Sequence, residues 1–144
     1  MTSSAATLSE ELARAIASWT EQDPDPQTRR QVEDLLAAAD VGDAAAMAEL
    51  VDAFSGRLEF GTAGLRGALG AGPNRMNRVV VGQAAAGLAT YLLDHDLAGG
   101  KVIIGFDARR NSDVFAKKGI IKTSGKLYIY FFIFLQNFFQ PGVG

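Results

Sequence analysis

Residues 60–67 read Phe-Gly-Thr-Ala-Gly-Leu-Arg-Gly, and this stretch constrains the chain most, because three glycines at three-residue spacing bracket one arginine. Without a Cβ atom, Gly61, Gly64 and Gly67 can adopt positive φ and let a ligand approach the main chain, so that N–H groups face an anion. Arg66 adds a planar, permanently charged group that suits phosphate. The same spacing is also typical of a glycine-rich surface turn with a solvated arginine, so spacing alone leaves both interpretations open.

Charge and composition narrow the class of protein. The chain has 144 residues, enough for one ordinary domain. Residues 1–116 carry sixteen acidic and ten basic side chains, and a body this acidic argues against a nucleic-acid binder, which needs a basic face. The absence of cysteine excludes disulfides and thiolate metal sites. The first residues lack the basic and apolar regions of a secretory signal, so we expect a cytoplasmic protein.

Residues 1–56 are predicted to form a leader of three amphipathic helices. Polar capping residues mark where each helix begins, and Asp23-Pro-Asp-Pro26 and Gly42 mark where the first and second end. Apolar residues recur at helical spacing, which predicts one buried face per helix. The predicted caps are Thr7 with Glu10, then Asp25 or Thr28, then Asp43. The predicted apolar faces are Leu8, Leu12, Ile16 and Trp19; Val32, Leu35, Leu36 and Ala39; and Met47, Leu50, Val51 and Phe54.

An α/β arrangement is predicted for residues 57–116. A short strand at residues 58–60 leads into the glycine stretch, and a helix opened by Asn74 or Asn77 runs from about residue 78 to residue 93. The apolar run at residues 101–106 has the composition of a buried parallel strand, which completes a βαβ unit. Arg109 then follows the carboxyl end of that strand, where open α/β sheets usually hold ligands.

Two smaller features complete this part of the chain. A further helix is expected to open at Asn111 or Ser112. The single histidine, His95, lies between two aspartates after the preceding predicted helix. Because it lacks a second ligand at helical or hairpin spacing, we assign His95 no metal-binding or catalytic role.

Two ordered motifs resemble the N-terminal part of the α-D-phosphohexomutases, the phosphoglucomutase and phosphomannomutase family. The glycine stretch, followed by Gly-Pro-Asn-Arg-Met-Asn-Arg at residues 72–78, is similar to the first signature of that family. Residues 105–112, Gly-Phe-Asp-Ala-Arg-Arg-Asn-Ser, are similar to its Gly-x-Asp-x-Arg-x-x-Ser. Trp19 and the Asp-Pro-Asp-Pro segment resemble the leader that opens one branch of the family. The resemblance runs from about Leu8 to Ala116.

The resemblance implies an α/β fold: an incomplete phosphohexomutase α/β/α domain I, with a mixed or parallel sheet and flanking helices, after the helical leader. It implies an isomerase that exchanges a phosphoryl group between C1 and C6 of a hexose phosphate through a phosphoserine, with Mg²⁺ offsetting charge. The implied phosphate-facing wall comprises Gly61, Thr62, Gly64, Arg66, Gly67 and Arg109.

The serine, metal and sugar loops of the family are not found in these 144 residues. We therefore assign no catalytic residue and no Mg²⁺ ligand, and we expect this chain alone to be inactive. The alternative is a non-catalytic remnant that binds anions weakly at the glycine stretch. The expected partner of the full-length family is a hexose phosphate, with neither nucleic acid nor membrane; glucose and mannose both stay open.

Residues 117–144 differ sharply in composition from the rest. All 23 alanines lie in residues 1–116, whereas the last 28 residues hold four lysines, no acidic residue and seven of the aromatic residues. This change is typical of a switch in codon usage, and we interpret the tail as a frameshift, a false gene end or a fused segment. The apolar run at residues 127–135 is shorter than the roughly 20 residues that a membrane-spanning helix needs. Its aromatic and β-branched content favours a strand, and we expect the tail to self-associate.

Overall fold

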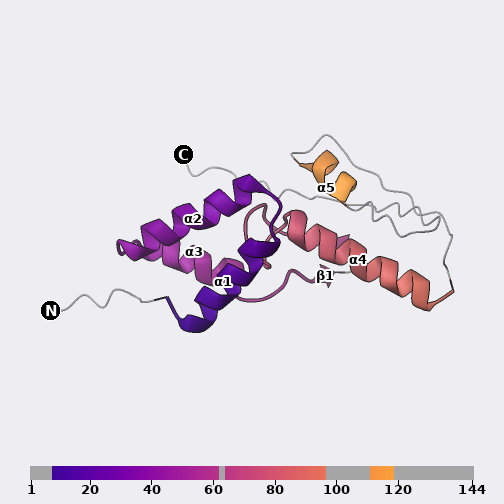
Figure 1. Ribbon diagram of the computed structural model, residues 1–144, viewed down its shortest axis with the longest axis horizontal. Coiled ribbons are helices and arrows are strands. Elements are labelled where there is room, and N and C mark those ends of the chain that lie inside the picture. The colour runs from indigo at the N-terminus through magenta and orange to yellow at the C-terminus, as the bar shows by residue number, and fades with distance from the viewer. Residues whose placement is uncertain (1–7, 62–63, 97–110, 119–144) are drawn as a thin grey trace. The chain divides into compact units, whose positions relative to one another are not determined.

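The computed structural model describes residues 8–61, 64–96 and 111–118 (Figure 1). These residues form two compact units, one made of the chain up to Leu58 with Leu69–Val79 and the other of Glu59–Ala68 with the chain from Val80 onward. None of the helices in the described ranges combines the length and the apolar character needed to cross a membrane. The elements are α1 (Glu10–Gln22), α2 (Pro26–Asp40), α3 (Ala44–Phe54), β1 (Phe60–Gly61), β2 (Gly64–Leu65), α4 (Arg78–Asp94) and α5 (Ser112–Lys118).

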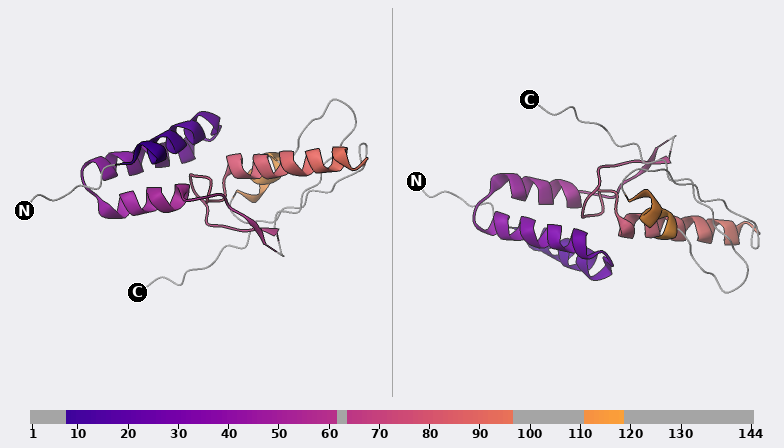
Figure 2. Two further views of the ribbon diagram at one scale, coloured as in Figure 1. Left: turned by 90° about the horizontal axis from the view of Figure 1, so that it is seen from below. Right: turned by 90° about the horizontal axis from the view of Figure 1, so that it is seen from above.

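The first unit is built on the three predicted leader helices, whose existence the structure confirms. In it α2 and α3 lie side by side and α1 packs against them (Figure 2). The Trp19 ring meets the Phe54 ring edge-on, with centroids 5.9 Å apart. Apart from one position on α3, the predicted apolar faces are buried or half-buried, which removes these side chains wholly or partly from water. The buried core of this unit comprises Ile16, Trp19, Val32, Ala39, Ala46, Leu50, Ala71 and Val79.

The caps of α2 and α3 are confirmed. The Asp25 side chain accepts a hydrogen bond from the Gln27 N–H at 3.0 Å, and Pro26 follows as the first helical residue. The Asp43 carboxylate accepts from the N–H groups of residues 45 and 46 at 2.9 and 3.2 Å. Both helices therefore start where an acidic side chain satisfies amides that have no partner inside the helix.

Two details of the predicted helices are wrong. The cap of α1 is Ser9, which accepts from the Leu12 N–H at 3.2 Å, and not Thr7. Glu10 is the first residue of the helix, so it cannot occupy the third-residue position that a capping box requires. On α3, Val51 is 50% exposed although we predicted it to be buried. It follows the fully buried Leu50 by about 100° around the helix and so turns away from the core.

We predict that Asp43→Ala lowers the free energy of unfolding by about 1 kcal/mol, because two amides at the start of α3 lose their acceptor. Chemical denaturation followed by fluorescence of Trp19, the single tryptophan, measures this change. Asp34→Ala, which removes an exposed carboxylate inside α2, is the matched control. Equal effects of the two substitutions would show that charge removal, and not loss of the cap, is responsible.

The first unit also contains the segment Leu69–Val79, which the sequence analysis assigned to the α/β part of the chain. The Leu58 N–H donates to the Pro73 carbonyl at 2.9 Å, and the Gly70 N–H donates to the Met76 carbonyl at 3.2 Å. Met76 is 1% exposed. The segment is thus folded together with the leader helices. The division of the chain at residue 56 stays a prediction, as does the division after residue 116.

The second unit contains a short hairpin. Strand β1 pairs with β2 in antiparallel fashion, with Phe60 opposite Leu65 and Gly61 opposite Gly64. The predicted strand at residues 58–60 therefore begins later than expected, because the Leu58 N–H bonds to Pro73 and does not enter a strand ladder. The predicted parallel strand at residues 101–106 lies outside the described residues, so the mixed or parallel sheet stays a prediction.

Both predicted helices of this region are confirmed. Helix α4 starts at Arg78, and its residues from Val80 onward belong to the second unit. Asn111, with φ 66°, precedes α5, and its carbonyl accepts from the Phe115 N–H at 2.9 Å. Helix α5 runs past Ala116 to Lys118, so it enters the segment that we interpreted as the tail. The buried residues from β2 onward in this unit are Leu65, Val80, Val81, Ala85, Ala89, Phe115 and Ala116.

Candidate functional site

The β1–β2 hairpin carries four of the six residues predicted to form the phosphate-facing wall. Gly61 and Gly64 lie opposite each other across the hairpin. Arg66 directly follows β2 and is exposed, and Gly67 is half-buried. Thr62 and Arg109 lie outside the described residues, so their predicted roles stay predictions.

The local geometry gives Arg66 access to solvent. Its neighbour Leu65 is 8% exposed, so the end of β2 is held by an apolar side chain while the next residue projects an exposed guanidinium. An exposed guanidinium attracts an anion only weakly, because water and salt screen the charge. The hairpin can therefore contribute one positive group to an anion site, and tight binding needs further groups.

A second candidate feature is the turn formed by residues 70–77, which we call the 70–77 turn. Gly72 has φ +102°, a conformation that side chains with a Cβ rarely adopt. A Cβ atom on Gly72 would lie 2.5 Å from the carbonyl oxygen of Ala53 in α3. The turn therefore approaches the backbone of α3 so closely that only glycine fits at this position.

Asn77 holds the turn from inside. Its side-chain amide nitrogen donates to the carbonyl oxygens of Gly72 at 2.7 Å, Gly70 at 2.9 Å and Arg75 at 3.2 Å. Asn77 is 2% exposed. Because a buried polar group without a hydrogen bond is costly, this one side chain supplies the donor for three main-chain carbonyls of the turn.

Arg75 attaches the turn to α3. One of its terminal nitrogens donates to the Glu49 carboxylate at 3.0 Å and also to Asp52, and the other donates to the Asn74 carbonyl at 3.3 Å. The Arg75 side chain is 12% exposed. Burial by itself lowers the pKa of Arg75, but the hydrogen bonds to Asp52 and Glu49 and the charge attraction of both carboxylates together outweigh burial, and the net pKa is raised. Arg75 is therefore a paired, permanently charged group.

The sequence did not predict the contacts that these three residues make in the turn. Gly72, Arg75 and Asn77 were noted only as part of the motif at residues 72–78, and Asn77 also as a possible start of α4. The sequence did contain a signal for this turn. A glycine is followed by proline, and one asparagine lies before the arginine and another after it, a pattern typical of turns with side-chain-to-backbone hydrogen bonds. The α3 partners of Arg75, Glu49 and Asp52, lie 26 and 23 positions earlier in the sequence.

The described residues do not fit a Mg²⁺ site. No group of three or more histidine, aspartate or glutamate side chains in the described ranges is placed to hold a metal ion. Glu49 and Asp52 lie close together, but Arg75 occupies their oxygens. His95 is exposed, stacks on Tyr91 with ring centroids 4.0 Å apart and bonds through Nδ1 to the Tyr91 carbonyl at 2.8 Å.

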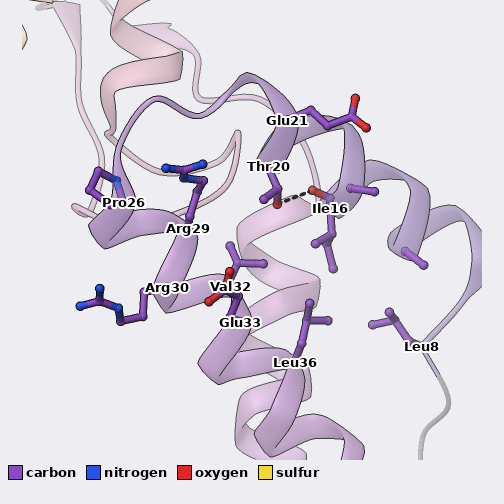
Figure 3. A pocket seen from close by; sticks show the side chains of 12 residues that line it. Leu8, Ile16, Thr20, Glu21, Pro26, Arg29, Arg30, Val32, Glu33 and Leu36 are labelled. Carbon is purple, nitrogen blue, oxygen red and sulfur yellow. Dashed lines mark hydrogen bonds between the residues drawn. The ribbon is translucent and has the colours of Figure 1, made fainter.

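An open groove of about 690 Å³ lies between α1 and α2 (Figure 3). Its interior is apolar, with Ile16 and Val32 facing each other from the two helices, whereas Arg30 and Glu21 point away (Figure 3). The Thr20 hydroxyl, at its edge, donates to the Ile16 carbonyl at 2.8 Å. The groove belongs to the first unit and the hairpin with Arg66 to the second.

Comparison with known proteins identifies the protein family whose domain includes the hairpin. Residues 57–123 match the family model described as phosphoglucomutase/phosphomannomutase, alpha/beta/alpha domain I. A phosphoribomutase of Saccharomyces cerevisiae is 38% identical over 111 residues, which are 77% of this chain and 17% of that protein. A phosphopentomutase of Mus musculus is 39% identical over 100 residues, which are 68% of this chain and 15% of that protein. No solved structure matches the chain significantly.

A shorter match concerns the glucose enzymes. A phosphoglucomutase of Staphylococcus saprophyticus is 45% identical over 65 residues, which are 45% of this chain and 12% of that protein. The chain thus spans less than a fifth of the length of these relatives. The relatives named here are phosphomutases. Within that class, residues 57–123 are a partial domain I of the phosphohexomutase family. The match extends beyond Ala116, where we expected the resemblance to stop.

Proposed function

We propose that this chain is part of domain I of a sugar-phosphate mutase, in which the hairpin supplies one wall of the phosphate-binding site. The observation that carries the proposal is the exposed Arg66 directly after strand β2, inside the segment that matches the family. Phosphoryl transfer needs positioning and positive charge around the phosphoryl oxygens. Gly61, Gly64 and Gly67 let the phosphate approach the main chain, and Arg66 offsets its charge. Thr62 and Arg109 are proposed to join this wall.

The proposed reaction of the full-length enzyme is interconversion of hexose 1-phosphate and hexose 6-phosphate, as in phosphoglucomutase and phosphomannomutase. Mg²⁺, when bound to such an enzyme, offsets charge on the transferred phosphoryl group. The residues described here bind and orient phosphate and hold no metal ion. We further propose a cytoplasmic location, supported by the absence of cysteine, which is compatible with a reducing compartment.

A pentose phosphate is the second candidate substrate. The yeast and mouse relatives that match over 111 and 100 residues are named for pentose or ribose phosphates, whereas the phosphoglucomutase match covers 65 residues. The longer matches include leader residues that precede the family domain. These longer matches are the observation that favours a pentose phosphate.

We propose that the 144-residue chain alone binds phosphate and does not catalyse the reaction. Phosphate in millimolar amounts, corresponding to a binding free energy of about −4 kcal/mol, is expected to shift the amide NMR signals of Gly61, Gly64, Arg66 and Gly67. Added salt should reduce the shifts, because the interaction is between exposed charges. Arg66→Ala should abolish them, whereas Arg57→Ala, which removes an exposed arginine before β1, should leave them in place.

The same samples test the absence of catalysis. With Mg²⁺ and a trace of glucose 1,6-bisphosphate, we expect no conversion of glucose 1-phosphate or ribose 1-phosphate above background in a coupled assay. Phosphate-induced shifts confined to the lysines of the tail, or unchanged in Arg66→Ala, would argue against a phosphate site at the hairpin. Turnover that survives purification and disappears in Arg66→Ala would contradict the proposed inactivity.

A further inference from the structure

The motif at residues 72–78 contains two arginines in a segment that matches a phosphate-handling family, so Arg75 is an obvious candidate for a phosphate ligand. The structure gives its guanidinium other partners. Both carboxylates that it contacts, Glu49 and Asp52, belong to α3, and its second terminal nitrogen bonds to the main chain at Asn74. Two negative charges therefore offset one positive charge at this point.

Further hydrogen bonds connect the 70–77 turn to the leader. The Asn74 N–H donates to the Ala53 carbonyl at 3.1 Å, and the Asn74 side chain donates to the Asp52 carbonyl at 3.0 Å. The Ala71 N–H donates to the side-chain oxygen of Gln31 in α2 at 3.0 Å. The leader thus supplies acceptors from both α2 and α3 to one turn.

We propose that Arg75 is a positioning residue that fixes the 70–77 turn on α3, and that it does not bind phosphate. An approaching phosphate would have to displace Glu49 and Asp52 and would leave their charges facing its own. The exposed Arg66 carries no comparable pair of carboxylates in the described part of the chain. The proposal does not rest on the proposed function, because it concerns the support of the turn.

The geometry also explains why this position is an arginine. The Arg75 guanidinium reaches two carboxylates through one nitrogen and a main-chain carbonyl through the other, all from one planar group. A lysine ammonium at the same position has a single nitrogen and cannot reproduce the separation of these acceptors. Arg75→Lys is therefore expected to restore the positioning only in part.

Hydrogen exchange on the full 144-residue chain tests this inference. In Arg75→Met we expect the Ala71 and Asn74 amides, which bond to Gln31 and Ala53, to exchange at least about tenfold faster than in the original chain. Arg75→Lys should give an intermediate rate. Lys117→Met is the matched control, because it removes an exposed cation from the Lys117–Asp113 pair of α5, and it should leave both amides unchanged.

A second measurement tests the exclusion of phosphate and does not need a destabilised variant. During a phosphate titration of the original chain, the Arg75 side-chain NMR signal should stay in place. Unchanged exchange of Ala71 and Asn74 in Arg75→Met, or a phosphate-dependent shift of Arg75 that Asp52→Asn enhances, would overturn the proposal. If Arg75→Met does not fold, Arg75→Lys and Asp52→Asn still report on the same two amides. Absence of a shift at Arg66 would count against the proposed function and not against this inference.

Discussion

Asn77→Asp is expected to lower the free energy of unfolding by about 3–5 kcal/mol, the cost typical of an unpaired buried charge. The change preserves the shape of the side chain but replaces an amide that donates to three carbonyls with a carboxylate that faces the same three oxygens. Because Asn77 is 2% exposed, water cannot compensate. Denaturation followed by Trp19 fluorescence measures the loss.

The pH dependence of this variant separates charge from lost hydrogen bonds. Burial against carbonyl oxygens raises the pKa of the introduced carboxyl above its unfolded value of about 4. Below a pH of about 4 the carboxyl is protonated in both the folded and the unfolded state, so its charge does not lower the free energy of unfolding. As the pH rises above about 4, the destabilisation due to the charge grows. Asn77→Ala loses the donors without adding charge, so its deficit should be smaller and nearly independent of pH. Equal deficits at neutral pH would contradict the assignment.

Gly72→Ala is the second substitution with a large expected effect, a loss of about 3 kcal/mol or more. The added Cβ would lie 2.5 Å from the Ala53 carbonyl oxygen, which is backbone and cannot rotate away, and Gly72 has φ +102°. The turn must therefore separate from α3. Thermal or chemical denaturation measures the loss, and weaker protection of the Asn74 amide in hydrogen exchange should accompany it.

Gly42→Ala is the matched control for backbone strain. Gly42 has φ +93°, but a Cβ atom there meets nothing within 4 Å. Its substitution should cost about 1–2 kcal/mol, the price of the left-handed conformation alone. If Gly42→Ala and Gly72→Ala are equally destabilising, the close contact with Ala53 contributes nothing and strain accounts for both.

The sequence predicted the helices well because each carries its own local signals. Asp25 and Asp43 were recognisable as caps, and apolar spacing placed Val32 and Leu50 in the core. The hairpin was harder to predict from the sequence. Strands β1 and β2 have two residues each, one of them glycine, so they are too short to show the alternation of apolar and polar residues that marks a strand. The sequence indicated Arg66 as a site residue through family resemblance, and the structure adds that this arginine is exposed.

The contacts of the 70–77 turn escaped prediction for a different physical reason. The partners of Arg75 are residues 49 and 52, and the partner of Ala71 is Gln31. Nothing in the local sequence of either segment specifies such distant pairs, which arise only when the helices pack. The motif signalled a turn, but only the structure shows that its arginine is neutralised by carboxylates of an earlier helix.

The start of the family model and the boundary of the first folded unit do not coincide in this chain. The family model begins at residue 57, yet Leu69–Val79 is folded on helices that end before that residue. A shortened protein that starts at the family boundary would present Ala71, Met76 and Val79 without the surface that covers them. Low stability or low solubility of such a protein would result from the choice of its first residue and would not be a property of the family domain itself.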